Sequence, residues 1–428
     1  MSPLGGLPNR SQFGERMSAS SGILELMKDL GEALTENRNS VMMGGGNPAR
    51  IPEVDSIWRQ VTKSLLSQPN VFGELLSNYD PPAGNPAFLD DLAGFLRRQC
   101  GWNVTRKNLA VTVGGQTAFF FLLNLFGGKN RDGSLRKVLL PMMPEYIGYS
   151  SQGISPELFY AIPSKLHLSG DHRFKYQLDL DAAESVSPIG AICVSRPSNP
   201  SANVLTDEEV RSLAALARKR GVPLILDNAY GLPFPGVIFT QATPFWDEHT
   251  IVTLSLSKLG LPGTRTGIVV AHEDVIRDIS AMTAVTGLAN TNLGQALVRP
   301  LLGDDRLADL CSEIIRPFYR NRCEAAFAEL DGKLAGLPYR LHEPEGAFFA
   351  WLWLPDLPVS TREMYRRLKQ RGLVVVPGEY FFYALEHEHR HHHECLRLTY
   401  TQPFERISQG ISILADEIRR CYEDSERA

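Results

Sequence analysis

Short runs of aliphatic and β-branched residues alternate with amphipathic segments through the middle of the chain. Six of these runs predict strands: NLAVTV (108–113), KVLLP (137–141), GAICVS (190–195), VPLILD (222–227), TIVTLS (250–255) and TGIVVA (266–271). Strands that alternate with helical segments are typical of a mostly parallel sheet with helices on its faces. The pattern therefore predicts an α/β fold.

The segment from Thr206 to Arg220 gives the clearest local prediction of a helix. It begins with TDEE, in which a threonine and a glutamate three residues later form a capping box. Gly221 follows at the position where a glycine usually ends a helix. We expect a helix with these two boundaries.

The last third of the chain has a different pattern. A long helical stretch from about Leu307 to Leu334 precedes short apolar runs that alternate with helices, which predicts a smaller α+β domain. The residues before Asn47 predict a helical segment that packs on this smaller domain or over a cleft. We therefore divide the chain into an N-terminal segment (1–60), a large domain (61–305) and a small C-terminal domain (306–428).

Composition narrows the possible partners. The net charge is −4 and charged residues make up 21% of the chain, so no basic surface is expected to attract nucleic acid or anionic lipid. The N-terminus lacks a signal-peptide pattern, and no run approaches the roughly 20 apolar residues of a membrane span. The six cysteines are far apart and favour free thiols. We expect a soluble cytoplasmic protein.

Half of the ten histidines lie in HEHRHHHE (387–394). The sequence favours a solvated surface loop here, and a metal site is the less favoured alternative.

Polar residues and glycines follow five of the predicted strands. In a parallel sheet, ligands bind beyond the carboxyl ends of the strands, so these residues are expected to converge on one site. In chain order they are Gly114, Gly115 and Gln116; Tyr146; Asn199; Asp227 and Tyr230; and Ser255, Ser257 and Lys258.

The dinucleotide pattern GxGxxG and the P-loop pattern are both absent after these strands. Pyridoxal phosphate suits the set better. It has a phosphate for a helix N-terminus, serines and an arginine, a ring nitrogen for a carboxylate, and an aldehyde for a lysine. Each residue alone has an ordinary structural explanation, as a cap, a turn or core filler. Together, after five strands, they favour a cofactor site.

Several motifs carry a resemblance to a known family. They are DNAY (227–230), SLSKLGLPGTRTG (255–267), SRPSNP (195–200) and YDPPAG (79–84), together with VMMGGGNPARIPE, PEYIGYS and EGAFFAWLWLPDLP. The chain resembles the aspartate-aminotransferase-like class of pyridoxal-phosphate enzymes, fold type I, nearly from end to end. This resemblance implies a mostly parallel seven-stranded sheet in the large domain.

The resemblance also implies the role of each residue. Lys258 bonds to the aldehyde and acts as the base, Asp227 pairs with the ring nitrogen, Tyr230 and Asn199 contact the phenolic oxygen, and Tyr146 stacks on the ring. The phosphate is held by Gly114, Gly115, Gln116, Ser255, Ser257 and Arg265, with Tyr79 arriving from the second chain of a homodimer. Arg397 and the backbone of Gly46 bind the substrate carboxylate, and Asn199 and Tyr146 adjoin the substrate.

Two departures from the family pattern stand out. The common NPTG is NPSA here (199–202), and the spacing from lysine to arginine is seven residues where many members have eight. The implied reaction exchanges an amino group between an amino acid such as valine and a 2-oxo acid such as pyruvate. We identify no second cation for a dicarboxylate, and Ile23, Leu24 and Tyr146 are candidates for side-chain selection. The alternatives are another small or neutral amino acid, a lyase of the same fold, and a non-enzymatic regulator.

Overall fold

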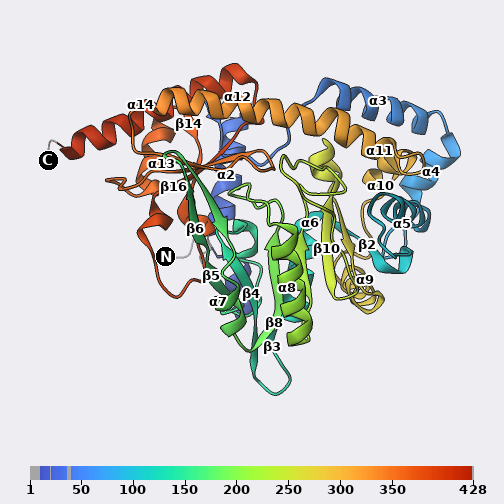
Figure 1. Cartoon of the computed structure of the whole chain (residues 1–428). Coiled ribbons are helices and arrows are strands. Elements are labelled where there is room, and N and C mark those ends of the chain that lie inside the picture. The colour runs from blue at the N-terminus through green and yellow to red at the C-terminus, as the bar shows by residue number, and fades with distance from the viewer. Residues whose placement is uncertain (1–9, 20, 36–39, 427–428) are drawn as a thin grey trace.

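The computed structural model describes residues 10–19, 21–35 and 40–426, and its centre is an eight-stranded sheet (Figure 1). Only β11 runs antiparallel to both of its neighbours in the body of the sheet, so the prediction of a mostly parallel sheet is confirmed. The eighth strand is β3, a two-residue strand that forms a hairpin with β4, and a pattern this short gives no signal in the sequence. The strand order is β2 (Leu109–Val113), β11 (Thr266–Val270), β10 (Thr250–Ser255), β9 (Leu224–Asp227), β8 (Ile189–Ser195), β4 (Leu135–Met143) and β3 (Gly128–Lys129), with β5 (Phe159–Pro163) also paired to β4.

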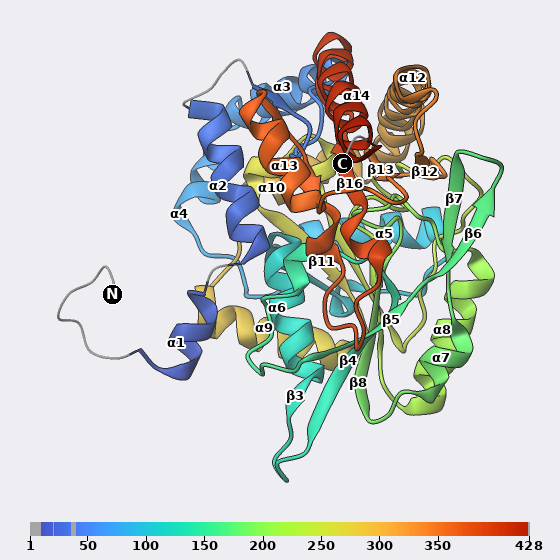
Figure 2. The same ribbon diagram turned by 90° about the vertical axis from the view of Figure 1, so that its left-hand side faces the viewer.

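Helices cover both faces of this sheet, which explains why its strands are apolar throughout. All seven residues of β8 are buried. Figure 2 shows α6 (Gly114–Phe126) and α9 (Glu273–Gly287) on one side, and α7 (Leu180–Ser185) and α8 (Asp207–Arg220) on the other. The predicted helix is confirmed as α8, with the Thr206–Glu209 capping box at its start and Gly221 in the left-handed conformation at its end.

The N-terminal part supplies helices and one short strand. Asn85 caps α5 by accepting hydrogen bonds from the amides of Ala87 and Phe88, and Gly101 ends it in the left-handed conformation. The strand β1 pairs with β14 in the C-terminal part of the chain. The elements are α1 (Gln12–Met17), α2 (Gly22–Thr35), β1 (Val41–Met42), α3 (Pro52–Leu66), α4 (Pro69–Ser77) and α5 (Pro86–Cys100).

A second sheet of six strands combines the C-terminal strands with a hairpin from the middle of the chain. Its β7 pairs in parallel with β12, so segments far apart in sequence share one sheet. Figure 2 shows this hairpin beside β12 and β13. The order is β15 (Val376–Pro377), β16 (Cys395–Thr399), β13 (Phe349–Trp353), β12 (Arg340–His342), β7 (Arg173–Gln177) and β6 (Lys165–Ser169).

The predicted helical stretch from 307 to 334 is confirmed. It consists of α11 (Arg306–Asp309), a π-helical turn (Leu310–Ile315) and α12 (Arg316–Leu334), which runs along the top of the molecule in Figure 1. The helix α10 (Leu293–Val298) precedes this stretch. The helices α13 (Thr361–Gln370) and α14 (Phe404–Glu426) and the strand β14 (Leu373–Val374) follow it.

The six cysteines are free thiols, as expected. Within the described residues, no helix combines the length and apolar character that crossing a bilayer requires. The division at residues 60 and 305 stays a prediction.

Candidate active site

The carboxyl ends of β2, β4, β8, β9 and β10 lie at the same edge of the central sheet. The strands β2 and β10 both pair antiparallel with β11, so they run in the same direction, and β10, β9, β8 and β4 pair in parallel. The residues after these strands therefore converge, as the sequence predicted. The charges of Asp227, Arg265 and Arg397 all act on Lys258 and on Tyr146.

Lys258 lies in a short 3₁₀ turn directly after β10. Its Nζ donates a 2.8 Å hydrogen bond to the Gly46 carbonyl and lies 5.0 Å from the centre of the Tyr230 ring. Burial of the amine, followed by the nearby Arg397 cation, lowers the pKa of Lys258 from 10.5 to about 8, against the opposing effect of Asp227. This shift raises the neutral fraction near pH 7, and the neutral amine is the form that acts as a nucleophile or a base.

Asp227, the last residue of β9, is a partly buried carboxylate held by neutral donors. It accepts hydrogen bonds from the Tyr149 hydroxyl, from the Ala229 amide at 3.0 Å and from the Thr253 hydroxyl at 3.3 Å. Burial raises its pKa, and these hydrogen bonds act in the opposite direction. No described side chain forms an ion pair with Asp227, so its negative charge suits a cationic ligand group.

Arg397 on β16 supplies a buried cation. Its Nη1 donates to Asn199 Oδ1 at 2.7 Å, its Nη2 donates to the Gly44 carbonyl at 2.6 Å, and its guanidinium lies 4.5 Å from the centre of the Phe349 ring. Its Nε has no hydrogen-bond partner among the described residues, and burial lowers its pKa to about 10. A buried arginine without a carboxylate partner suits an anionic ligand.

Arg265 packs against the start of α6. Gly114 has φ +75°, and a Cβ there would lie 2.2 Å from Arg265 Nη2, so the guanidinium packs against the first turn of the helix. The first amides of a helix lack intrahelical acceptors and attract anions. The two predicted serines lie at the end of β10 and in the turn after it, where the Ser257 amide donates a 3.2 Å hydrogen bond to Ser255 Oγ. Gly115 and Gln116 lie in the first turn of α6 with Gly114.

Two buried residues that sequence reasoning missed surround Tyr146. The Glu145 carboxylate accepts hydrogen bonds from the Tyr146 amide (2.8 Å), the Ser195 amide (2.9 Å) and the Ser195 hydroxyl. Burial raises the pKa of Glu145 to about 7. The Tyr146 carbonyl accepts from the Tyr383 hydroxyl at 2.9 Å, so the backbone of Tyr146 is held from both sides. Tyr149, the donor to Asp227, packs its ring edge-on to Tyr146 at 5.2 Å.

Tyr79 and two of the selectivity candidates lie apart from this cluster within the chain. Tyr79 is 81% exposed and makes no hydrogen bond to the site among the described residues. Ile23 and Leu24 line a cavity of about 660 Å³ together with Gln116 and Gly148, and the lining of that cavity includes neither Lys258 nor Arg397.

The expectation of a solvated histidine loop is wrong for two of its residues. His391 is partly buried, with its Nε2 2.6 Å from the Tyr176 hydroxyl, and His392 is buried and stacks on Phe382 with ring centres 4.3 Å apart. The polar composition of the loop predicted solvation, but a neutral imidazole is a flat ring that can pack against aromatic side chains. Among the residues that the structure covers, no group of three or more His, Cys, Asp or Glu side chains is arranged to bind a metal ion.

The sheet order, the flanking helices and the polar set at the strand ends define a fold type I pyridoxal-phosphate enzyme. The sequence profile described as "Aminotransferase class I and II" matches residues 54–411. The chain therefore belongs to the class I and II aminotransferase family, whose members are enzymes that depend on pyridoxal phosphate.

Individual relatives cover almost the whole chain. The chain is 42% identical over 97% of its length to the valine–pyruvate aminotransferase of Escherichia coli K12, of which the match covers 99%. A putative amino-acid aminotransferase from Psychrobacter arcticum 273-4 superposes with a TM-score of 0.94 at 41% identity, covering 97% of this chain and all of that one. The valine–pyruvate aminotransferase AvtA from Salmonella typhimurium LT2 gives 0.86 at 41% identity, covering 94% and 99%.

The residues of this chain fit the family's cofactor. The Gly114 backbone and Arg265 form a cradle that a Cβ would fill, which suits the phosphate. Asp227 is a partly buried carboxylate that forms no ion pair within the described residues, which suits a protonated ring nitrogen. Lys258, with its lowered pKa, lies in the same site.

Proposed function

We propose that this chain exchanges the amino group between L-valine and pyruvate, giving 2-oxoisovalerate and L-alanine, with pyridoxal 5′-phosphate as cofactor. The observation that carries the proposal is the 42% identity, over nearly the full length of both chains, to the Escherichia coli valine–pyruvate aminotransferase. A hydrophobic pocket separates substrates that differ by one methylene by only about 1 to 3 kcal/mol, so we expect some activity with alanine and 2-aminobutyrate.

In this proposal Lys258 is the catalytic base. Bound pyridoxal phosphate supplies a conjugated ring that accepts the electrons released when the substrate Cα loses its proton. Lys258 holds the cofactor in the resting enzyme and moves the proton at the substrate Cα, a task for which its lowered pKa is suited. Asp227 keeps the ring nitrogen protonated by pairing its negative charge with that cation.

The remaining cofactor contacts orient the ring. Tyr230 and Asn199 donate hydrogen bonds to the phenolic oxygen, and Tyr146 packs on the ring face. Asn199 is suited to this role because its Oδ1 is occupied by Arg397, which leaves its amide N–H groups to donate elsewhere. The phosphate is held by Gly114, Gly115, Gln116, Ser255, Ser257 and Arg265.

Arg397 binds the substrate α-carboxylate, with the Gly46 backbone beside it. The support is the burial of Arg397 and its Nε, which lacks a partner in the described chain. Asn199 and Tyr146 adjoin the same substrate group. The rings of Phe349 and Phe381 lie 4.5 and 5.2 Å from the guanidinium and exclude water from the ion pair with the carboxylate.

We also propose a cytoplasmic homodimer in which the Tyr79 hydroxyl reaches the phosphate in the neighbouring subunit. The exposure of Tyr79, which leaves its side chain accessible to a second subunit, is compatible with that role. The dimer is tested by light scattering, together with a mixture of Tyr79→Phe and Lys258→Ala chains, which should regain part of the activity that each variant lacks alone.

The direct test incubates the purified protein with valine, pyruvate and pyridoxal phosphate and measures 2-oxoisovalerate and alanine. Equal amounts of both products support the proposal. Ammonia release without a 2-oxo-acid acceptor would indicate a lyase, and turnover of another amino acid with none of valine would refute the substrate assignment. The Lys258→Ala variant should lack both the activity and the visible absorption band of the bound cofactor.

A further inference from the structure

The loop that follows β8, residues 199–205, carries Asn199 and holds an unfavourable backbone conformation. Ala202, which stands where the common family pattern has glycine, has φ +64° and is buried. A non-glycine residue in this region is strained, and such strain persists only where the surroundings hold the backbone in place. The loop therefore needs restraints.

One restraint is a nearly buried ion pair at the end of the loop. The Glu345 carboxylate accepts a 2.9 Å hydrogen bond from the Val204 amide, and Lys175 Nζ donates one of 3.0 Å to the Val204 carbonyl. Lys175 and Glu345 pair at 2.5 Å, with only 17% and 15% of their side chains exposed. Both polar groups of the Val204 backbone thus contact one ion pair.

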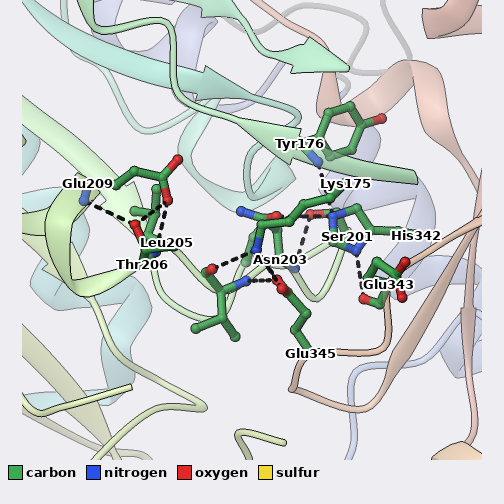
Figure 3. Close-up of polar contacts among 12 residues, drawn as sticks. Lys175, Tyr176, Ser201, Asn203, Leu205, Thr206, Glu209, His342, Glu343 and Glu345 are labelled. Atoms are coloured by element: carbon green, nitrogen blue, oxygen red, sulfur yellow. Dashed lines mark hydrogen bonds and ion pairs between the residues drawn. The ribbon is translucent and has the colours of Figure 1, made fainter. Parts of the chain in front are cut away.

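A second restraint holds the middle of the loop. Asn203 Oδ1 lies 3.0 Å from His342 Nε2, and the His342 Nδ1 contacts the Glu343 carbonyl at 2.8 Å (Figure 3). Burial lowers the pKa of His342 to about 3, so the ring stays neutral over the working pH range, and its single N–H donates to only one of these two oxygens. Of the residues that hold the loop, Lys175 lies on β7, His342 is the last residue of β12, and Glu345 follows β12. Arg397 on β16 donates a hydrogen bond to Asn199 at the start of the loop.

We propose that Lys175 and Glu345 are positioning residues for the transamination reaction: through Val204 they fix the strained loop and so direct the Asn199 amide at the cofactor. The inference rests on the proposed function, in which Asn199 contacts the phenolic oxygen. Glu345→Gln leaves the largely buried Lys175 ammonium without its counter-charge and replaces the charged acceptor at Val204 by a single neutral amide oxygen, so the loop relaxes and Asn199 turns away.

The test compares Glu345→Gln and Lys175→Met with Asp331→Asn as a matched control. Asp331 of α12 pairs with Arg173 of the same hairpin at 2.9 and 2.5 Å, but this pair makes no contact with residues 199–205 in the described structure. The control therefore loses a similar ion pair between the same two parts of the chain. Holoenzyme of each variant is assayed for kcat and KM, for the pH dependence of its visible absorption band, and for thermal unfolding.

We expect both variants to lose about 10- to 100-fold in kcat/KM, since a misplacement of about 1 Å at a reacting centre has effects of this size. The pH midpoint of the visible band should rise by about half a unit or more, because a lost hydrogen bond to the phenolic oxygen destabilises its anionic form. Asp331→Asn should stay within about twofold of the parent enzyme and keep its midpoint.

Asn199→Ala separates this inference from the proposed function. If Asn199→Ala leaves both kcat/KM and the midpoint unchanged, the proposed role of Asn199 is wrong. If Asn199→Ala impairs both but Glu345→Gln and Lys175→Met behave like Asp331→Asn, the positioning role is overturned. Should Glu345→Gln fail to fold, Lys175→Met decides alone, because it retains the aliphatic part of the side chain and the hydrogen bond from Val204 to Glu345.

Discussion

The lowered pKa of Lys258 allows a quantitative test of the site without the cofactor. Burial and the Arg397 cation move this pKa from 10.5 to about 8. Since one pKa unit is worth about 1.4 kcal/mol, the ammonium form is disfavoured by about 3 kcal/mol. At pH 7, about one Lys258 amine in ten is then neutral, against about one in three thousand for an ordinary lysine.

The assay treats apoprotein with a small uncharged aldehyde and borohydride between pH 6 and 10, and mass spectrometry measures the modification of Lys258. Because only the neutral amine reacts, the rate should rise about tenfold per pH unit and level off near pH 8. Exposed lysines of the same sample, which level off at higher pH, are the internal reference.

Two variants test the causes of the shift separately. Arg397→Met removes a cation that disfavours the ammonium form, so the midpoint for Lys258 should move to higher pH. Asp227→Asn removes a charge that favours the ammonium form, so the midpoint should move to lower pH. A parent midpoint equal to that of the exposed lysines, or a downward shift in Arg397→Met, would refute the reasoning.

Three further predictions follow from single contacts. Tyr149→Phe removes a donor to the carboxylate at the end of β9, whose pKa should rise, so we expect kcat to fall about tenfold; an unchanged kcat–pH profile would contradict this. Gly114→Ala should weaken cofactor binding at least about tenfold in a fluorescence titration, because the new Cβ would collide with Arg265. Gly115→Ala is the control, because the space around its Cβ is open. Equal affinities of the two variants would show that Gly114 and Arg265 do not hold the phosphate as proposed. Burial lowers the pKa of His391 to about 3, below its unfolded value near 6.5, so the folded state loses stability as the pH falls from about 6.5 toward 4. The thermal unfolding temperature of His391→Gln should therefore depend less on pH in that range than that of the parent protein. An identical pH dependence would argue against a lowered pKa for His391.

The central sheet and most of its strand-end residues could be predicted because both depend on local patterns. A strand buried on both faces must be apolar along its length, and a polar residue directly after it marks the edge where ligands bind. Asp227, the last residue of β9, and Lys258, three residues after β10, lie at this edge. The six predicted strands correspond to β2, β4, β8, β9, β10 and β11.

Glu145 and Tyr149 were missed because their partners are distant in sequence. The carboxylate of Glu145 is satisfied by Ser195, and the hydroxyl of Tyr149 by Asp227, neither of which is adjacent along the chain. Polar residues within PEYIGY, directly after β4, were the available signal. The burial of His391 depends on Tyr176 in the same way, so the composition of the loop could not reveal it.

The partner of the β6–β7 hairpin was equally hidden. In KLHLS, Leu166 and Leu168 alternate with polar residues, which is compatible with a strand but does not identify the sheet to which it belongs. Pairing of β7 with β12 links Arg173 to Leu341, and a contact of that sequence separation leaves no local pattern.

This shared sheet has a consequence for how the protein is made. A fragment that starts at Arg306 would expose the edge of β12 that β7 covers in the intact chain, and bare strand edges recruit other molecules into aggregates. During synthesis, β7 leaves the ribosome long before its neighbour exists, so the sheet that holds Arg397 can close only after β12, β13 and β16 have been synthesised.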